Sequence, residues 1–202
     1  MSRAGSNAGA GHSVERLRAL FAEGEFPPAA AFVRPDLAPA AVLVPLVLRE
    51  EGLSVLLTRR SRHLNHHPGQ ISFPGGRIDE ADASPEAAAL REASEEIALP
   101  ASRVEVLGRL PDFPVGTGFL ISPVVGLVRP PLDLRASPAE VDEIFEAPLS
   151  FLLNQGNHQR HAFPGEKRHY WSIPWKHYAI WGATAGILRG LSEALAQREN
   201  FR

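Results

Sequence analysis

The sequence contains no cysteine, which excludes disulfides and metal sites built on thiolates. It also contains no run of about 20 apolar residues, the length that a membrane-spanning helix needs. The N-terminal stretch MSRAGSNAGAGHS lacks the apolar segment that a secretory signal carries. Together these absences lead us to expect a cytoplasmic protein with no membrane partner.

A surplus of basic charge is also missing. The 21 Lys and Arg residues are fewer than the 23 Asp and Glu residues, so the net charge is −2. A chain without a basic field is not expected to bind nucleic acid. Lysine is scarce, with 2 residues against 19 Arg, which we attribute to genomic composition.

The 202 residues that are present fit a single domain. We expect residues 1–12 to form a disordered tail because they are rich in Gly, Ala and Ser. Residues 13–39 are expected to contain a helix that begins at Ser13, followed by a Pro-rich connector. Residues 40–197 would then form the domain itself.

Within residues 40–197, segments typical of strands are interspersed with segments typical of helices, which favours a mixed α/β domain. The runs AAVLVPLVLRE and GLSVLLTRR are predicted to form a β-hairpin around a Glu-Glu-Gly turn. Further strands are expected in RVEVLGRL, ISPVVGLVR and HYWSIPW, with PDFPVGTGF as a loop. The acidic segment EVDEIFEAPLSFLL is expected to lead into a short helix, and a long helix over about 179–197 closes the chain.

One further helix has clear start and stop signals. Ser84 is a good N-cap, Pro85 suits the first helical position, and Pro100 limits the end. The residues expected on its apolar side are Ala89, Leu90, Ala93 and Ile97.

Three glutamates lie beside this apolar side. With about 100° per residue, Glu92, Glu95 and Glu96 share one face. Like charges at this spacing destabilise a helix by about 0.2–0.5 kcal/mol per pair, and Arg91 offers the obvious local compensation. A divalent cation is the natural partner for such a cluster.

The segment before the helix could add oxygen ligands. Gly75 and Gly76 allow close backbone approach, and the loop after them contains Asp79, Glu80 and Asp82. Hard oxygen ligands suit Mg²⁺ or Mn²⁺, and Mg²⁺ commonly shares its shell with substrate phosphates. The arrangement therefore predicts phosphate chemistry assisted by a metal ion.

The stretch GGRIDEADASPEAAALREASEEIAL resembles the Nudix box, whose pattern is G-x5-E-x7-R-E-U-x-E-E-x-G-U, where U is a bulky aliphatic residue. Residues 91–99 align with its second half. Three departures stand out: Ala93 is smaller than the usual aliphatic residue, Ala98 replaces a glycine, and the spacer from Gly76 to Arg91 is one residue longer. The last change leaves the role of Asp82, near the first glutamate position, undefined.

The longer spacer resembles the Nudix subfamily that hydrolyses coenzyme A. The upstream stretch LLTRRSRHLNHHPGQISFPGG, from Leu56 to Gly76, also resembles the signature of that subfamily. Asn65 stands where the subfamily usually has Arg, so either the affinity for substrate is altered or a neighbouring arginine such as Arg62 takes over the contact. Later segments are similar too, so the resemblance runs from about 40 to 190.

The resemblance implies an α/β/α sandwich with a mixed sheet, a small-molecule substrate and cleavage of the pyrophosphate of coenzyme A to 3′,5′-ADP and 4′-phosphopantetheine. It implies Mg²⁺ or Mn²⁺ as the cofactor and leaves the oligomeric state open. The implied metal ligands are Glu92, Glu96, Glu95 and the carbonyl of Gly76. The implied catalytic residues are Glu95, Arg91 and Glu92. The implied substrate-binding residues are Arg60, His67, Gln70 and Gly75.

Several alternatives stay open at this point. The general base is Glu92, Glu95 or an acid outside the box such as Glu143. The substrate could be another nucleoside diphosphate derivative, such as NADH, ADP-ribose or a nucleotide sugar. A different class of function is a non-catalytic nucleotide sensor, which the presence of Arg91 and all three box glutamates disfavours. The 3′-phosphate of coenzyme A could be held by one of Arg59, Arg60 and Arg62.

Overall fold

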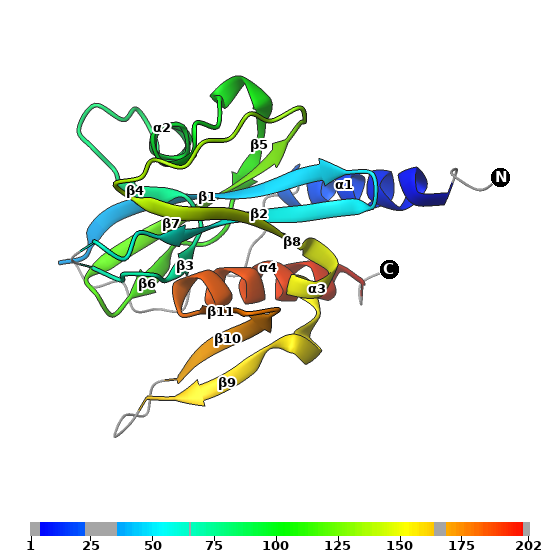
Figure 1. Ribbon diagram of the computed structural model, residues 1–202. Helices are drawn as coiled ribbons and strands as arrows, with labels where there is room; N and C mark the ends of the chain where they lie inside the picture. Colours follow the sequence, from blue (N-terminus) through cyan, green and yellow to red (C-terminus); the bar gives the residue numbers. More distant parts are fainter. Residues whose placement is uncertain (1–4, 23–35, 65, 164–168, 200–202) are drawn as a thin grey trace.

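The computed structural model describes residues 5–22, 36–64, 66–163 and 169–199. They form a large mixed sheet with helices on both faces and a smaller sheet to one side (Figure 1). The helices are α1 (Gly5–Ala22), α2 (Pro85–Ile97), α3 (Leu149–Leu153) and α4 (Ala183–Glu199). This arrangement confirms the predicted α/β sandwich.

The large sheet is built around the predicted hairpin. Its eight strands are β1 (Ala38–Arg49), β2 (Gly52–Arg60), β3 (Ile71–Ser72), β4 (Gly75–Arg77), β5 (Val104–Arg109), β6 (Phe113–Val115), β7 (Phe119–Val128) and β8 (Val141–Pro148). Strand β1 pairs antiparallel with β2 and β4 but parallel with β7, which makes the sheet mixed. Strand β8 pairs antiparallel with β2.

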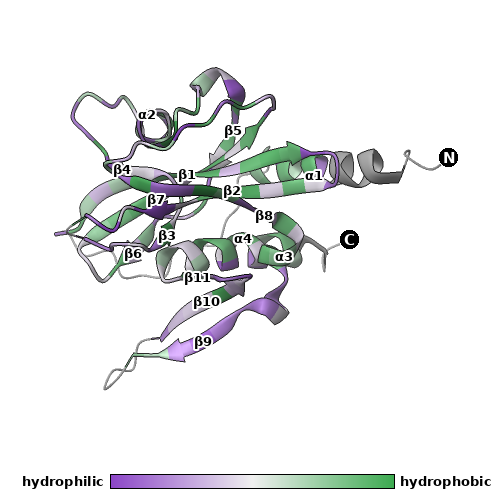
Figure 2. Cartoon of the chain, viewed as in Figure 1, coloured by the Kyte–Doolittle hydropathy of each residue, from purple (hydrophilic) through white to green (hydrophobic). Residues whose placement is uncertain are grey.

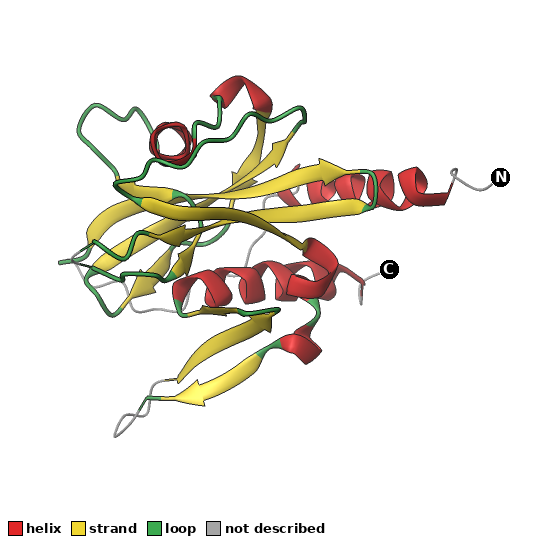
Figure 3. Cartoon of the chain, viewed as in Figure 1, coloured by secondary structure: helices red, strands yellow, loops and turns green. Residues whose placement is uncertain are grey.

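Two cores lie on opposite faces of this sheet. Along β1, Leu43 and Val47 join the core under α2, whereas Val44 and Leu46 join the core on the side of α1 and α4. A strand covered on both faces reads as a continuous apolar run, and this explains the sequence of β1. In Figure 3, α2 lies on one side of the large sheet and α4 lies on the other. Helix α1 packs into the same core as α4.

The smaller sheet was only partly predicted. It contains β9 (Gln159–Ala162), β10 (His169–Trp175) and β11 (Tyr178–Trp181), in the order β11-β10-β9. The sheet lies beyond α4 (Figure 1), with Ile173 and Ile180 fully buried in the α4 core. Figure 2 shows β9 as hydrophilic, in contrast to the apolar strands β1 and β2.

Several predicted boundaries differ from the structure. The N-terminal helix begins at Gly5 rather than Ser13, so Ser13 is not its cap. The last helix begins at Ala183, because the residues before it form β11. The segment PDFPVGTGF is not only loop, since it contains β6. Most of the Pro-rich connector and residues 1–4 lie outside the described residues, and the limits of the three predicted regions stay a prediction.

No helix in the described part of the chain has the length and apolar character needed to cross a membrane.

Candidate active site

Helix α2 forms because both of its ends are specified locally. The Ser84 side chain accepts a hydrogen bond from the Ala87 N–H at 3.2 Å, and Pro85 occupies the first turn. At the other end Ala98 is left-handed, with φ of 53°, and the Leu99 N–H donates to the Ala93 carbonyl. The predicted helix and both of its boundaries are thus confirmed.

The apolar side of α2 sets the direction of its glutamates. Ala89, Ala93 and Ile97 are fully buried against the large sheet. The small side chain of Ala93, one of the departures from the Nudix pattern, therefore fits a position in the core. Packing of this side leaves Glu92 half-buried and Glu95 exposed. The Glu92 carboxylate lies against Gly76 of β4.

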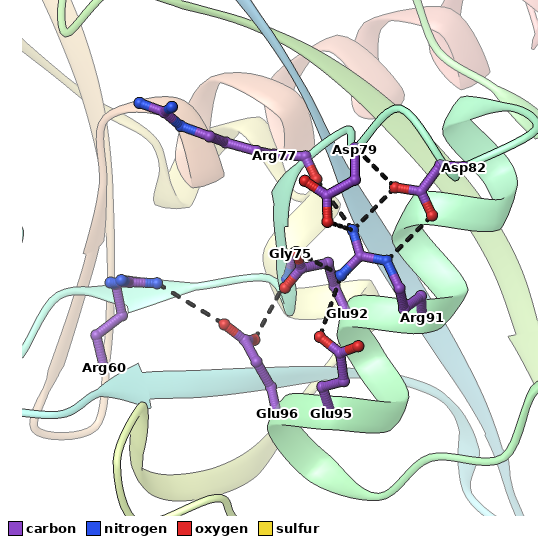
Figure 4. A network of polar contacts seen from close by, with 9 residues as sticks. All are labelled: Arg60, Gly75, Arg77, Asp79, Asp82, Arg91, Glu92, Glu95 and Glu96. Carbon is purple, nitrogen blue, oxygen red and sulfur yellow. Dashed lines mark hydrogen bonds and ion pairs between the residues drawn. The ribbon is translucent and has the colours of Figure 1, made fainter.

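Arg91 connects the acidic residues (Figure 4). Its guanidinium donates to Glu92 at 3.0 Å and to Glu95 at 3.1 Å, and it also donates to the carbonyl of Arg77 at 3.1 Å. Ion pairs between a guanidinium and carboxylates are strong and directional. Arg91 therefore holds the helix glutamates and the end of β4 in one network.

Asp82, whose role the longer spacer left undefined, is the partner that orients Arg91. Its two carboxylate oxygens accept from Arg91 at 3.0 and 2.9 Å, a bidentate pair. The Asp79 N–H also donates to the Asp82 carboxylate, at 2.8 Å. Hydrogen bonds from Arg91 and then from Asp79 lower the pKa of Asp82, so it remains ionised. In Figure 4, Asp82 lies on the other side of the Arg91 guanidinium from Glu95 and Glu96.

Glu96 is the deepest of the three glutamates, with 3% of its surface exposed. The Gly75 N–H donates to its carboxylate at 3.3 Å, and the Arg60 guanidinium lies 3.8 Å away. Burial raises the pKa of Glu96 to about 8, although Arg60 and the Gly75 N–H act in the opposite direction. A buried carboxylate with such limited compensation is costly for stability, which points to a functional role.

The two glycines lie in close contact with their neighbours. A Cβ on Gly75 would collide with the backbone of β1 at Ala41 and Val42, so glycine is required there. A Cβ on Gly76 would meet the end of the flexible Glu92 side chain, which shows how near β4 lies to this carboxylate. The predicted proximity of these glycines to the helix glutamates is confirmed.

One acid near the site was not singled out from the sequence. Burial raises the pKa of Glu92, and the negative charges of Glu95 and Glu140 raise it further, against the effect of Arg91. The charge of Glu140 also raises the pKa of Glu96. Glu140 lies 44 residues after Glu96 in the chain, and it is brought close because the Ser137 N–H donates to the Glu96 carbonyl. No local pattern in the sequence indicates this contact.

Glu143 does not join the cluster. It lies on β8 two residues before Phe145, a position that faces the α4 core rather than α2. Its carboxylate accepts from the Tyr178 hydroxyl at 2.6 Å and pairs with Arg59 at 3.0 Å. This geometry places Glu143 on the other face of the sheet from the helix glutamates.

The residues expected to bind substrate lie around the loop between β2 and β3. The Arg60 N–H donates to the Gln70 carbonyl at 3.0 Å, which closes this loop beside Glu96. The Gln70 side chain lies against Gly182, just before α4. His67 is exposed at the loop tip, with φ of 54°, and is not brought to the carboxylates by any described contact. Asn65 lies outside the described residues.

The donor chemistry fits a hard divalent cation. Among the described residues, no three His, Asp or Glu side chains already surround one point as metal ligands do. The helix glutamates instead form ion pairs with Arg91 and Arg60, of which the Arg60–Glu96 pair is long at 3.8 Å. The oxygen-only donor set and the poorly compensated Glu96 carboxylate nevertheless match what Mg²⁺ or Mn²⁺ requires.

Comparison with known proteins identifies a matching family. A model of the NUDIX domain matches residues 37–171. The chain is 48% identical over 157 residues to an uncharacterised Nudix hydrolase, NudL, of Enterobacter sp. (strain 638), covering 76% of this chain and 80% of the relative. The NudL protein of Escherichia coli (strain K12) is 48% identical over 155 residues, with coverage of 76% and 80%.

Solved structures agree on the fold. The NUDIX domain of Shewanella oneidensis NrtR, crystallised with ADP ribose, matches with a TM-score of 0.51 at 21% identity, covering 88% of this chain and 97% of that one. A NUDIX hydrolase from Alicyclobacillus acidocaldarius matches with a TM-score of 0.51 at 19% identity, covering 80% and 93%. At these identities the two matches bear on the fold alone.

Proposed function

Because the chain belongs to the Nudix hydrolase family, we propose that it hydrolyses the pyrophosphate bond of coenzyme A. The observation that carries this proposal is the position of the segment from Leu56 to Gly76. This segment resembles the signature of coenzyme A hydrolases, and it runs along β2, β3 and β4 to end beside the carboxylates of α2. In this proposal, the subfamily signature and the Nudix box contribute to one site.

In the proposed reaction, water attacks one phosphorus atom of the pyrophosphate and the bridging P–O bond breaks. Coenzyme A and water become 3′,5′-ADP and 4′-phosphopantetheine. Pyrophosphate is inert because its negative charge repels nucleophiles, and a bound Mg²⁺ or Mn²⁺ supplies charge neutralisation and activation of water. We assign Glu92, Glu96, Glu95 and the Gly76 carbonyl to hold that ion.

The remaining groups have distinct tasks. Arg91 positions Glu92 and Glu95 through the hydrogen bonds described above. Glu95 is the most exposed of the three glutamates, with 56% of its side chain accessible, so it can reach a water proton. We assign Glu95 as the general base and Glu92 as the alternative. Arg60, Gln70, Gly75 and His67 are assigned to the substrate.

The first test uses a substrate panel. The protein is incubated with Mg²⁺ or Mn²⁺ and with coenzyme A, NADH, ADP-ribose or a nucleotide sugar, and the products are separated by chromatography. Fastest release of 3′,5′-ADP from coenzyme A, abolished by chelator, supports the proposal. Faster cleavage of another dinucleotide overturns the coenzyme A assignment, and binding without cleavage favours a sensor.

A substitution tests the ligand assignment. Glu96→Gln removes a carboxylate charge at nearly constant size, and activity is expected to fall at least about 100-fold, since loss of even an outer-shell partner costs about 10–100-fold. Glu80→Gln is the matched control, because Glu80 is an exposed acid of the preceding loop. Wild-type activity in Glu96→Gln would remove Glu96 from the ligand set.

A further inference from the structure

Two arginines lie beside the helix glutamates, and they are held in different ways. Arg91 donates five hydrogen bonds, two of them to the Asp82 carboxylate, so its guanidinium is fixed in place. Arg60 lies 3.8 Å from the Glu96 carboxylate, and within the described part of the chain its side chain makes no hydrogen bond and no other ion pair. In the view of Figure 4, the two arginines lie on opposite sides of Glu96. Arg60 is therefore a loosely held cation at the deepest carboxylate of the site.

Strand β2 directs Arg60 to this carboxylate. Successive side chains of a strand point to opposite faces of the sheet. Arg59 accordingly pairs with Glu143 on the α4 side, whereas Arg60 reaches Glu96 on the α2 side. The backbone of Arg60 is held in place, because its N–H donates to the Gln70 carbonyl at 3.0 Å. The Arg60 side chain therefore extends toward Glu96 from a fixed point of attachment.

Arg60 supplies the positive charge that the other neighbours of Glu96 do not provide. Glu92 and Glu140 act on Glu96 as further negative charges, and the Gly75 N–H donates a single hydrogen bond at 3.3 Å. A buried carboxylate needs a partner of opposite charge. Only 4% of the Glu96 side chain is exposed, whereas 28% of the Arg60 side chain is exposed. The counter-ion of Glu96 is therefore the more accessible member of the pair.

Glu96 cannot keep Arg60 as its close partner once its carboxylate ligates a divalent cation, because two positive charges at one carboxylate repel each other. Arg60 can give way, since no described hydrogen bond holds its guanidinium and part of its side chain is exposed. A guanidinium released in this way presents N–H groups whose geometry matches two phosphate oxygens. Arg91 cannot act in the same manner, because Asp82 fixes it.

We propose that Arg60 is an exchangeable counter-ion of Glu96. It pairs with Glu96 in the metal-free protein, leaves when Glu96 takes up a divalent cation, and then pairs with a phosphate group of the ligand. Arg60 thus weakens the binding of the metal ion alone and makes the metal ion and a phosphate ligand bind cooperatively. This inference rests on the assignment of Glu96 as a metal ligand under the proposed function.

The first test measures Mn²⁺ binding to the protein without substrate, by electron paramagnetic resonance of the free ion. Arg60→Gln removes the competing charge and should bind Mn²⁺ about 5- to 150-fold more tightly than the wild type, the usual range of a coupling between two sites. Arg60→Lys keeps the charge and should stay within about 3-fold of the wild type. Unchanged or weaker binding by Arg60→Gln, or equal tightening in both variants, would show that Arg60 is not a competing counter-ion.

The matched control is Arg109→Gln, which removes the same charge at the other end of α2. Arg109 pairs with Glu86 in the first turn, ten residues before Glu96 and therefore about 15 Å away along the helix axis. This separation exceeds the Debye length of about 8 Å at physiological ionic strength, so Mn²⁺ affinity should change less than about 2-fold. Circular dichroism melting checks that each variant is folded.

A measurement on the wild type does not depend on whether the Gln variant folds. The Nε–H resonance of Arg60, assigned by its disappearance in Arg60→Lys, should shift when Mg²⁺ is added, because the guanidinium leaves Glu96. The corresponding resonance of Arg109 should not shift. An Arg60 resonance that stays in place at saturating Mg²⁺ would overturn the exchange.

The second test measures the coupling to a phosphate ligand. Titration calorimetry follows the binding of α,β-methylene-ADP, a pyrophosphate analogue that is not hydrolysed, without metal and at saturating Mn²⁺. Mn²⁺ should strengthen this binding, and the gain should be at least about 5-fold smaller in Arg60→Gln than in the wild type. The reason is that only the wild type has a guanidinium that the metal ion releases. An equal gain in both proteins would contradict the transfer of Arg60 to the ligand.

These binding measurements separate the inference from the proposed function, because none of them needs hydrolysis. Tighter Mn²⁺ binding by Arg60→Gln supports the exchange even if coenzyme A is not cleaved, and the proposed substrate alone is then wrong. Cleavage of coenzyme A by the wild type, together with equal Mn²⁺ affinities of the wild type and Arg60→Gln, overturns the exchange and leaves the proposed function standing. Absence of both Mn²⁺ binding and cleavage overturns both.

Discussion

Arg91 and Asp82 illustrate how single residues prepare the site. Arg91 donates to Glu92 and Glu95, and it donates two further hydrogen bonds to the Asp82 carboxylate. Because Asp82 already fixes the Arg91 guanidinium, Arg91 loses less conformational freedom when it orients Glu92 and Glu95. Asp82 is thus a positioning residue that acts through Arg91.

Asp82→Asn is predicted to lower activity about 10–100-fold, the cost usually found for loss of an outer-shell partner. Asparagine keeps the size but removes the charge and one of the two acceptors for Arg91. Steady-state kinetics at saturating Mg²⁺ would measure the change. Asp79→Asn is the matched control, because Asp79 is exposed and lies 3.6 Å from Arg91. Equal activities of the two variants would contradict the role of Asp82.

Glu96 predicts a pH dependence of stability in the metal-free protein. Burial raises its pKa from 4.5 to about 8. Between these values the folded protein retains a proton that the unfolded chain releases, so the free energy of unfolding falls as pH rises. The slope from one such group is at most about 1.4 kcal/mol per pH unit.

Urea denaturation with chelator at pH 5, 6.5 and 8 would measure this dependence. The readout is the difference between the wild type and Glu96→Gln, which cancels the contribution of other titrating groups. Glu96→Gln should gain stability relative to wild type as pH rises. A difference that stays constant with pH would contradict the raised pKa.

At the scale of elements, helix α2 ends on a residue whose type does not suit its backbone conformation. Ala98 adopts φ of 53°, a left-handed conformation that costs an L-residue about 1–2 kcal/mol. Glycine adopts this conformation without that cost. It also increases the conformational entropy of the unfolded chain, which lowers the free energy of unfolding by about 0.4–1 kcal/mol. Ala98→Gly is therefore predicted to raise the free energy of unfolding by about 0.5–1 kcal/mol, measured by urea denaturation.

The control for this prediction is Ala87→Gly in the first turns of the same helix, where the dihedral angles are helical. That change should lower the free energy of unfolding by up to about 1 kcal/mol. The same sign for both substitutions would show that the left-handed conformation of Ala98 carries no cost.

Elements with strong local signals were predictable from the sequence, and those that depend on distant contacts were not. Ser84 and Pro85 specify the start of α2, and the apolar runs of β1 and β2 flank an obvious turn. Strand β11 was missed because its hairpin turn contains Lys176 with φ of 52°, a conformation normally indicated by Gly or Asn. Its apolar residues also run directly into α4, so they were assigned to that helix.

The residues of the candidate site also divide into those that local sequence patterns predict and those that only distant contacts bring together. Local spacing was enough to predict the three glutamates, Arg91 and the glycine pair. All of them lie within the 22 residues from Gly75 to Glu96. Glu140 reaches the cluster only through a loop attached to the end of α2, and Arg77 reaches Phe119 only across β1. Contacts of this kind depend on sheet register, which local patterns do not specify.

At the scale of the whole molecule, the core extends beyond the region that matches the family. The match begins at residue 37, yet Leu17 and Leu20 of α1 are 2% and 1% exposed within the core shared with α4. A Cβ on Gly108 would collide with the Phe21 ring, so α1 also lies directly on β5. Helix α1 is therefore part of the folded unit.

Leu20→Ala is predicted to lower the free energy of unfolding by about 2–5 kcal/mol, because it leaves a cavity between α1 and the sheet. Glu15→Ala, at an exposed position of the same helix, should change it by about 0.5 kcal/mol or less. Denaturation curves at matched pH would measure both. A change below about 1 kcal/mol in Leu20→Ala would mean that α1 is not an integral part of the core.

The turn between β6 and β7 offers a practical handle for spectroscopy. Thr117 is exposed in this turn, two residues before the ring on which the Arg77 guanidinium rests. Because the chain has no thiol of its own, Thr117→Cys would create a single attachment point for a maleimide fluorophore. Emission from that label would report changes in the surroundings of this turn when candidate substrates are added, independently of any product assay.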